Sequence, residues 1–287
     1  MKPDIHHKTP LLTIIHQIEY VVKSRYNLHM TLNICWLYYD LMNTYGDYGN
    51  LLALEYRLKQ LQIKTQISYF SVNSSQSLLE KADLFLMGGA EDRQQELVAK
   101  DLVGQKRRIL QQKIQKQVPG LYICGAYQFL GEYYLTAAAK KLNCLNFAPL
   151  STKSAKPHQT RLIGDIVVEI TNPNLRPYFQ QSNNRFLIGF ENHNGRTYLK
   201  KRDNALGKVI LGKGNNGLDH LEGVFFQNTL GTYLHGPILP RNPALADFLI
   251  EKALQIKYNQ VISLKPIDDQ LEQQNRLRLL KEFHVKI

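Results

Sequence analysis

The chain has 287 residues and a mass of 33.1 kDa, with 44% hydrophobic and 21% charged residues. This composition is typical of a folded globular protein and excludes the disordered and fibrous classes. No apolar run reaches the ~18–20 residues of a membrane span, and the charged first thirty residues lack the apolar core of a secretory signal. Three widely spaced cysteines, an odd number, favour a reducing compartment over a disulfide scaffold. We therefore expect a cytoplasmic protein with no membrane span.

The net charge of +12 raises the question of nucleic-acid binding. The basic residues gather in two stretches, 100–116 and 196–213. The first stretch has the helical spacing of a solvated basic face, and neither contains a helix-turn-helix, zinc-finger or RNA-binding aromatic signature. We therefore predict no dedicated nucleic-acid partner, although the charge allows attraction to an anionic surface.

The first half of the chain alternates predicted strands and helices. Residues 1–30 form an extension in which Leu11–Val22 has the apolar rhythm of a short amphipathic helix. The strands that we predict after it are Leu32–Tyr39, Lys64–Phe70, Asp83–Met87 and Leu121–Ile123. Between them we predict a turn over Asn43–Asn50 and helices over Leu51–Leu61 and 92–116. This alternation indicates an α/β fold, with a mostly parallel sheet and helices on both of its faces.

The second half of the chain is richer in predicted strands. These are Leu162–Ile170, Phe186–Phe190, Val209–Leu211 and Gly223–Phe226, followed by a helix from Asn242 to Tyr258 and a charged helix over Ile267–Phe283. No internal repeat or low-complexity linker divides the sequence. We therefore expect an N-terminal extension (1–30), one α/β domain (31–260) and a C-terminal helical extension (261–287).

One stretch matches a nucleotide-binding pattern, but its context does not suit that role. Gly212–Gly217 satisfies G-x-G-x-x-G, yet a dinucleotide site needs a helix directly after the last glycine. The next predicted element is the strand Gly223–Phe226, so we predict a loop at 212–217. The sequence also contains no G-x-x-x-x-G-K-[ST] motif and no metal-ligand spacing. We expect no metal site and no cofactor held by this chain.

Cys124 stands in the context that a nucleophilic cysteine requires. It follows the apolar run Leu121–Ile123 and precedes Gly125 and Ala126, which begin a helical stretch. A tight strand-to-helix turn of this kind exposes the sulfur at a helix N-terminus, where the helix dipole favours the thiolate. The turn also presents the Gly125 N–H to a developing oxyanion. Gly89, which follows a neighbouring strand, offers a second N–H donor.

A thiolate nucleophile needs an imidazole for proton transfer, and nine histidines are available. His235 is distinctive because it ends a short apolar strand, Gly231–His235, before a Gly-Pro turn. Open α/β sheets assemble their sites at the carboxyl ends of their strands. A structural histidine is the alternative for any single residue of this type. On its placement, His235 is the partner that we predict for Cys124.

Seven stretches, in colinear order within residues 32–285, match one pattern: Leu41–Asn50, Gly88–Arg93, Ile123–Gln128, Arg161–Asp165, Gly189–Tyr198, Gly214–Gly217 and Gly231–Pro237. Together they resemble the class I, or triad-type, glutamine amidotransferases, in the branch that is similar to cobyric acid synthase. The run G-F-E-N-H-x-G-R-T-Y is specific to a subfamily of that branch. The resemblance implies a flavodoxin-like sheet with helices on both faces and a glutamine-hydrolysing activity.

The resemblance also implies roles for individual residues. Cys124 would be the glutaminase nucleophile, His235 its base, and Arg161 a contact to the glutamine substrate. Many class I members carry a glutamate two residues after the catalytic histidine, but this chain has Pro237 at that position. We therefore expect a Cys–His dyad whose third, orienting group is unassigned. Ala126 replaces a usual glycine and is small enough to preserve the turn.

A glutaminase without a phosphate loop cannot activate an acceptor, so the resemblance implies a second subunit. The partner would be a MurT-like ligase that forms a heterodimer with this chain, holds ATP and Mg²⁺, and amidates the D-glutamate of lipid II. L-glutamine would be the substrate of this chain, at the inner face of the membrane. Two alternatives remain open here: an amidotransferase subunit with another acceptor, such as a corrinoid carboxylate, and a catalytically silent binding subunit.

Overall fold

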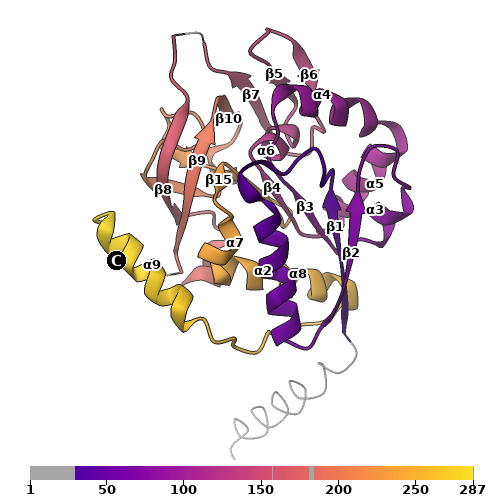
Figure 1. Cartoon of the computed structure of the whole chain (residues 1–287), viewed down its shortest axis with the longest axis vertical. Coiled ribbons are helices and arrows are strands. Elements are labelled where there is room, and N and C mark those ends of the chain that lie inside the picture. The colour runs from indigo at the N-terminus through magenta and orange to yellow at the C-terminus, as the bar shows by residue number, and fades with distance from the viewer. Residues whose placement is uncertain (1–29, 157, 181–183, 287) are drawn as a thin grey trace, which may run out of the picture.

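The computed structural model describes residues 30–156, 158–180 and 184–286 (Figure 1). The helix predicted over Leu11–Val22, and all but the last residue of the predicted extension 1–30, lie outside these ranges. In the part of the chain that the structure describes, no helix combines the length and the apolar character needed to cross a membrane.

A six-stranded sheet forms the centre of the fold, in the order β13-β14-β4-β3-β1-β2. Its strands are β1 (Thr31–Leu37), β2 (Lys64–Phe70), β3 (Leu84–Met87), β4 (Gly120–Ile123), β13 (Val224–Phe226) and β14 (Thr229–Thr232). All neighbours pair in parallel except β13 and β14, which are antiparallel. Every residue of β3 and β4 is buried, as expected for parallel strands covered on both faces. The predicted sheet is confirmed.

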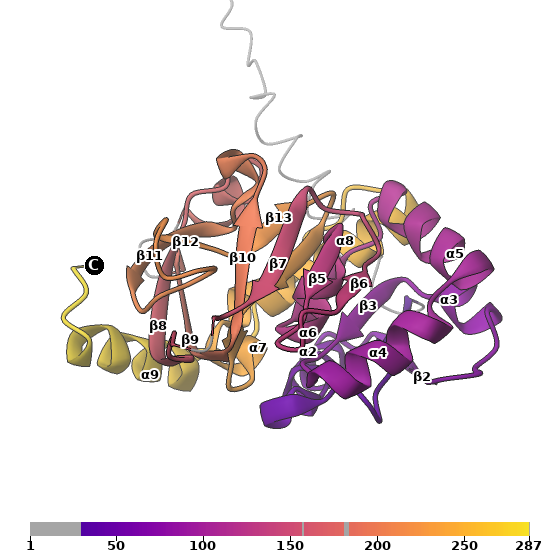
Figure 2. The ribbon, with the colours of Figure 1, turned by 90° about the horizontal axis from the view of Figure 1, so that it is seen from above.

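Helices cover both faces of this sheet (Figures 1 and 2). On one face, α2 (Tyr48–Gln60) packs against α8 (Pro243–Tyr258); on the other, α3 (Ser77–Lys81) packs against α5 (Gly104–Gln115), with α4 (Asp92–Asp101) beside them. The single helix predicted over 92–116 is wrong. The chain leaves the helical conformation at Leu102 and Val103, and Gly104 restarts it with a φ of 54°, which glycine tolerates without steric cost.

Two further sheets extend the fold beyond the flavodoxin-like core. One contains β10 (Gly195–Leu199), β7 (Leu150–Ser154), β5 (Tyr133–Leu135) and β6 (Lys141–Asn143). The other contains β12 (Leu221–Glu222), β11 (Gly207–Leu211), β8 (Leu162–Ile170), β9 (Phe186–His193) and β15 (Leu234–His235). The short elements are η1 (Thr44–Gly46), α6 (Gly125–Phe129), η2 (Arg176–Phe179), η3 (Arg202–Asn204) and α7 (Ile238–Arg241). Figure 2 shows these sheets beside the central one.

The C-terminal segment is attached to the rest of the chain. Its helix α9 (Gln270–Glu282) packs Leu280 against Val167 and Ile188 of the five-stranded sheet. Just before α9, Asp269 shares the buried Arg57 guanidinium with Asp247, at 2.6 Å for each pair. These contacts hold residues 269–282 against α2, α8 and the side sheet.

The strand order brings four segments to one edge of the central sheet. β1 pairs with β2 on one side and with β3 on the other, so the crossovers diverge at this point. Open α/β sheets bind ligands in the crevice at such a point, beyond the carboxyl ends of the strands. The segments that follow β1, β3, β4 and β14 carry Tyr45, Gly89, Cys124 and His235, respectively.

His235 reaches this edge by a change of sheet. The sequence predicts one strand over Gly231–His235, but the structure has two. β14 ends at Thr232, paired with Ile123 of β4, whereas β15 pairs His235 with Phe190 of β9. Tyr233 lies between the two strands and belongs to neither. Cys124 and His235 are therefore carried by different sheets.

Candidate active site

Cys124 occupies a strained turn between β4 and α6. Its φ of 53° and ψ of −105° lie in a region that residues with a side chain rarely adopt. Its N–H donates to the Thr232 carbonyl at 2.8 Å, and its own carbonyl accepts from the Gln128 N–H at 3.0 Å. These bonds hold the turn, and the predicted strand–cysteine–helix layout is confirmed. Cys124 is 8% exposed and lines the pocket described below, which a small ligand can enter.

The His235 imidazole is buried beside Cys124. A Cβ placed on Gly89 would stand 3.2 Å from His235 Cε1 and 3.3 Å from Cys124 Cβ, so both side chains border the same glycine. Burial alone would lower the pKa of His235, but the neighbouring Cys124 and Asp47 side chains outweigh it and raise that pKa to about 10. His235 therefore holds a proton at neutral pH, next to a sulfur whose negative charge that proton can stabilise.

Asp47 is the residue of this cluster that the sequence analysis missed. Its Oδ1 lies 3.6 Å from His235 Nδ1, and the carboxylate is 2% exposed. A carboxylate on Nδ1 orients an imidazole and leaves Nε2 to face the nucleophile. Asp47 stands where the chain enters α2, inside the predicted turn Asn43–Asn50. The available signal was the resemblance over Leu41–Asn50, which includes an acidic residue just after a strand.

The N–H of Gly89, predicted as an oxyanion donor, is already engaged. It donates to Asp47 Oδ2 at 2.6 Å, while the Gly89 carbonyl accepts from Thr44 Oγ1 at 2.9 Å. The role of the Gly89 N–H as an oxyanion donor therefore stays a prediction, and in this structure that N–H is bonded to Asp47. Gly89 ties the loop after β1 to the loop after β3. The Ala90 N–H is close to the turn: it lies 2.9 Å from where a Cβ on Gly125 would stand.

A pocket of about 360 Å³ opens in front of Cys124. Its walls come from the loops after β1 and β3, from α6 and from the two side sheets; they include Thr44, Tyr45, Glu91, Gln128, Arg161 and His193. The Tyr45 ring packs edge-on against the His235 imidazole, with 5.0 Å between centroids. This contact helps to cover the imidazole, which has no accessible surface. The volume suits a ligand of amino-acid size.

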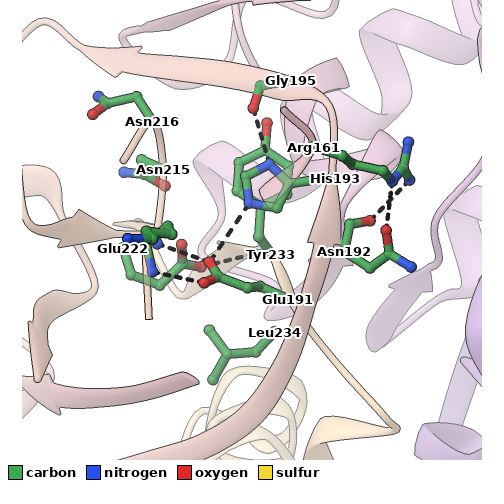
Figure 3. Close-up of polar contacts among 12 residues, drawn as sticks. Arg161, Glu191, Asn192, His193, Gly195, Asn215, Asn216, Glu222, Tyr233 and Leu234 are labelled. Carbon is green, nitrogen blue, oxygen red and sulfur yellow. Dashed lines mark hydrogen bonds and ion pairs between the residues drawn. The ribbon is translucent and has the colours of Figure 1, made fainter. Parts of the chain in front are cut away.

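Arg161, the predicted substrate contact, lies at the rim of this pocket. Its Nε and Nη2 donate to the side-chain and main-chain oxygens of Asn192, the latter at 3.1 Å, and Nη2 lies 3.4 Å from the Tyr45 hydroxyl. Figure 3 shows the guanidinium lying across Asn192. The guanidinium is exposed at the rim, so part of its donor set can face a carboxylate. Asn192 comes from the stretch Gly189–Tyr198, which carries the family resemblance.

The neighbouring residues of that stretch have structural partners. Glu191 accepts the N–H groups of Lys213 and Gly214 at 2.6 and 2.8 Å, and this bonding holds the glycine-rich loop (Figure 3). The loop leads into the strand β12, not into a helix, so the predicted loop at 212–217 is confirmed. His193 Nδ1 donates to the Gly195 carbonyl at 2.9 Å, and burial lowers the pKa of its ring.

A buried hydrogen-bonded network lies behind the pocket, centred on Tyr233. Its hydroxyl lies 2.6 Å from Thr197 Oγ1 and accepts from Gln128 Nε2 at 3.2 Å. The His193 ring stacks on the Tyr233 ring at 3.5 Å between centroids. Thr197 belongs to the four-stranded sheet, Gln128 to α6 next to Cys124, and His193 to the five-stranded sheet. The tyrosine therefore joins the three sheets at the point where the chain changes from one to another.

Glu222 is a second buried carboxyl close to this junction. Its Oε1 accepts from Thr232 Oγ1 at 2.8 Å and from the Tyr233 N–H at 2.7 Å. Burial raises the pKa of Glu222 to about 8; these hydrogen bonds lower it and nearby Glu191 raises it further. The carboxyl is therefore mostly protonated at pH 7.

Glu222 is expected to make folding stability depend on pH. Unfolded, the carboxyl ionises near 4.5, whereas folded it ionises near 8, so its contribution is fully present below pH 4.5 and is lost as pH rises to 8. The loss is on the order of a few kcal/mol. Glu222→Gln cannot ionise and keeps the acceptor for Thr232. The Tm difference, variant minus wild type, should grow between pH 5 and pH 8.5; parallel Tm profiles would contradict this.

Sequence comparison identifies the family. Residues 33–243 match the CobB/CobQ-like glutamine amidotransferase domain. The chain is 38% identical over 242 residues to the lipid II isoglutaminyl synthase (glutamine-hydrolyzing) subunit GatD of Staphylococcus aureus (strain N315), covering 84% of this chain and 91% of that protein. It is 37% identical over 248 residues to the subunit of the same name from Streptococcus pneumoniae (strain ATCC BAA-255 / R6), covering 86% and 90%.

Solved structures show the same fold at low sequence identity. The PurLQS structure from Thermotoga maritima includes a chain with a TM-score of 0.51 and 16% identity, covering 80% of this chain and 99% of that one. The CTPS glutaminase domain of Trypanosoma brucei with bound acivicin gives a TM-score of 0.50 and 12% identity, covering 82% and 96%. This protein therefore belongs to the CobB/CobQ-like glutamine amidotransferases, in the group that contains the GatD subunits, and is an enzyme of the glutamine amidotransferase class.

Proposed function

We propose that this chain is the glutaminase subunit of a lipid II isoglutaminyl synthase. In this proposal it hydrolyses L-glutamine and passes ammonia to a MurT-like, ATP-dependent ligase that amidates the D-glutamate of lipid II. The names of the two relatives support the synthase assignment. The observation that carries the chemistry is the strained turn that places Cys124 in the wall of the pocket, beside a buried His235 that Asp47 contacts.

The first half of the proposed reaction is acylation of Cys124. The thiolate attacks the side-chain amide carbon of glutamine, and the carbonyl oxygen becomes an oxyanion. We assign its stabilisation to the N–H groups of Gly125 and Ala90, because Gly89 donates to Asp47. When the tetrahedral intermediate collapses, the carbon–nitrogen bond breaks and His235 gives a proton to the departing nitrogen. Ammonia and a γ-glutamyl thioester result.

The second half returns the enzyme to its starting state. A water molecule attacks the thioester carbon while His235 accepts its proton, and the carbon–sulfur bond breaks to release glutamate and the Cys124 thiolate. Asp47 has the role of a positioning residue: it holds the imidazole and stabilises its protonated form from the Nδ1 side. Arg161 at the pocket rim would bind the glutamine α-carboxylate.

A separate ligase is required because the sequence has no phosphate-binding loop of the G-x-x-x-x-G-K-[ST] type. Free ammonia becomes protonated in neutral water and loses its nucleophilicity, so a protected route to an activated acyl group is needed. We place the assembled heterodimer in the cytoplasm, at the membrane face where lipid II presents its peptide. ATP and Mg²⁺ would bind to the ligase.

Reconstitution tests this function directly. The chain, its companion ligase, ATP, Mg²⁺, lipid II and glutamine should together yield amidated lipid II, detected by mass spectrometry, with one glutamate released per amide formed. Omitting the chain should abolish glutamine-dependent amidation but preserve amidation supported by added ammonia. Glutamine hydrolysis without lipid II amidation would favour another acceptor. Failure to hydrolyse glutamine in any combination would favour a silent binding subunit.

Truncation of Arg161 should weaken substrate binding. Because the guanidinium binds a part of glutamine that does not react, Arg161→Ala should raise KM about tenfold or more and change kcat little. Arg161→Lys should recover only part of the loss, since an ammonium cannot reproduce the two-pronged contact. Steady-state glutamate release checks both values. An unchanged KM in Arg161→Ala would remove this residue from the substrate site.

A further inference from the structure

The outer side of α2 presents an apolar stripe to solvent. Tyr48, Leu52 and Tyr56 follow one another at intervals of four residues, so they lie on one face of the helix. They are 41%, 47% and 51% exposed, while Leu51, Leu54 and Leu58 on the opposite face are buried. In Figure 1, α2 lies at the front of the molecule. The helix thus buries one apolar face within the protein and exposes another.

Two further tyrosines enlarge this stripe at its N-terminal end. Tyr48 stacks on Trp36 with 5.3 Å between centroids and an interplanar angle of 13°. Tyr39 and Tyr69 pack around the same tryptophan, and their own rings meet edge-on at 5.2 Å. The exposed side chains Tyr39, Tyr48, Leu52, Tyr56 and Tyr69 are called the tyrosine face below. Exposed tyrosines packed on a buried tryptophan are typical of protein-binding surfaces. They offer a large contact area and lose little side-chain entropy on binding.

A groove runs along the same helix and adds depth to the tyrosine face. It has a volume of about 340 Å³ and lies between α2 and the segment around α7. Its lining is mainly apolar and includes Gly49, Leu52, Ala53, Tyr56, Leu239 and Pro240. Such a groove can receive an apolar side chain of a partner, which is how energetically dominant interface residues are usually buried.

The tyrosine face adjoins the mouth of the Cys124 pocket. Tyr45 is 46% exposed and lines that pocket, and only Gly46 and Asp47 separate it from Tyr48 at the start of the stripe. Asp47 contacts His235, so the segment that carries the tyrosine face also carries part of the active site. A protein bound on this face would therefore lie close to the mouth of the Cys124 pocket.

We propose that the tyrosine face is the docking site of the ATP-dependent ligase. This inference rests on the proposed function, because it needs a partner that consumes ammonia. A second copy of this chain is the weaker occupant: it would bring another cysteine pocket to the mouth but no activated acyl group. The companion ligase is the partner that would use ammonia released from the Cys124 pocket, so contact at this position would serve its reaction. The relatives are themselves named as subunits of a synthase.

Charge substitutions on the stripe test the proposal. Leu52→Glu and Tyr56→Glu place a carboxylate in the centre of the face without touching the catalytic cluster. The matched control is Leu218→Glu, which makes the same change at a leucine that is 73% exposed in the loop before β12. Each protein is titrated against the purified companion ligase for Kd, and labelling of Cys124 by acivicin is followed by mass spectrometry to report an intact site.

The expected result is at least a tenfold increase in Kd for Leu52→Glu and Tyr56→Glu, with acivicin labelling as in the wild type. Leu218→Glu should change neither. Wild-type affinity in both stripe variants, or no binding of the ligase by the wild type, would overturn the proposal. So would a wild-type homodimer that Leu52→Glu dissociates while ligase binding persists. If the proposed glutaminase function is wrong, acivicin will not label Cys124 in the wild-type protein, and this result is distinct from a loss of ligase binding.

Discussion

Replacing Cys124 with alanine or serine is expected to abolish glutamate and ammonia release from glutamine. The covalent step has no alternative thiol in the pocket, because Cys124 is the one cysteine in its lining and the other two are buried elsewhere in the fold. Residual hydrolysis should be at the detection limit of a coupled glutamate assay, and the labelling by acivicin should disappear with it. Glutaminase activity at the wild-type level in Cys124→Ala would end the amidotransferase mechanism proposed for this chain.

The remaining cysteines supply matched controls for that experiment. Burial raises the pKa of the Cys35 and Cys144 thiols to about 12 each, so neither supplies thiolate at neutral pH. Cys35→Ala and Cys144→Ala should therefore keep full activity and full labelling. Their cost should appear in thermal stability, since both side chains are packed in the interior.

Substitution of His235 should cost roughly 10²–10⁴ in turnover, the range for loss of a general acid–base group. His235→Asn removes the proton that stabilises the Cys124 thiolate and the donor to the departing ammonia. Labelling by acivicin should slow as well, whereas the far-UV circular dichroism spectrum should be unchanged. His193→Asn and His220→Asn are the comparisons. A loss as large in either of these, with activity retained in His235→Asn, would show that the base is misassigned.

A smaller loss is expected for Asp47→Asn, because this residue acts through His235. Asp47 is one of the groups that raise the pKa of His235 to about 10, so its removal should lower that pKa. In a plot of the acivicin labelling rate against pH, the change at alkaline pH should therefore occur at a lower pH than in the wild type. If Asp47 only supported the fold, its substitution would change the labelling rate without shifting this pH dependence. The pH profile therefore distinguishes a structural role from a role in positioning His235.

Local sequence patterns predict the long elements of this fold well. Lys64–Phe70, Leu162–Ile170 and the helix ending at Tyr258 have the predicted bounds to within one residue, because each has a clear hydrophobic period and a turn or proline at its start. The strands β5 and β6 have three residues each, and only the middle residue of each strand is buried. Their pairing is determined by segments that are distant in the sequence, so no local sequence pattern predicts these two strands.

The site shows the same division between local and distant information. Cys124 is predictable because the strand, the small residues and the helix that make its turn are adjacent in sequence. Asp47 is not, because its approach to His235 depends on how the loop after β1 folds against Gly89. The hydrogen bond from the Gly89 N–H to Asp47 has the same origin, because only the folded loop brings that carboxylate to Gly89.

The change of sheet at Tyr233 has a mechanical consequence for the enzyme. Since Cys124 is carried by the central sheet and His235 by the five-stranded one, the separation of sulfur and imidazole depends on how these two layers are seated. Any displacement of one layer relative to the other would change the path of the transferred proton. The Tyr233 hydroxyl, which bonds to Thr197 and Gln128 next to the active site, is one of the contacts that keep these layers aligned.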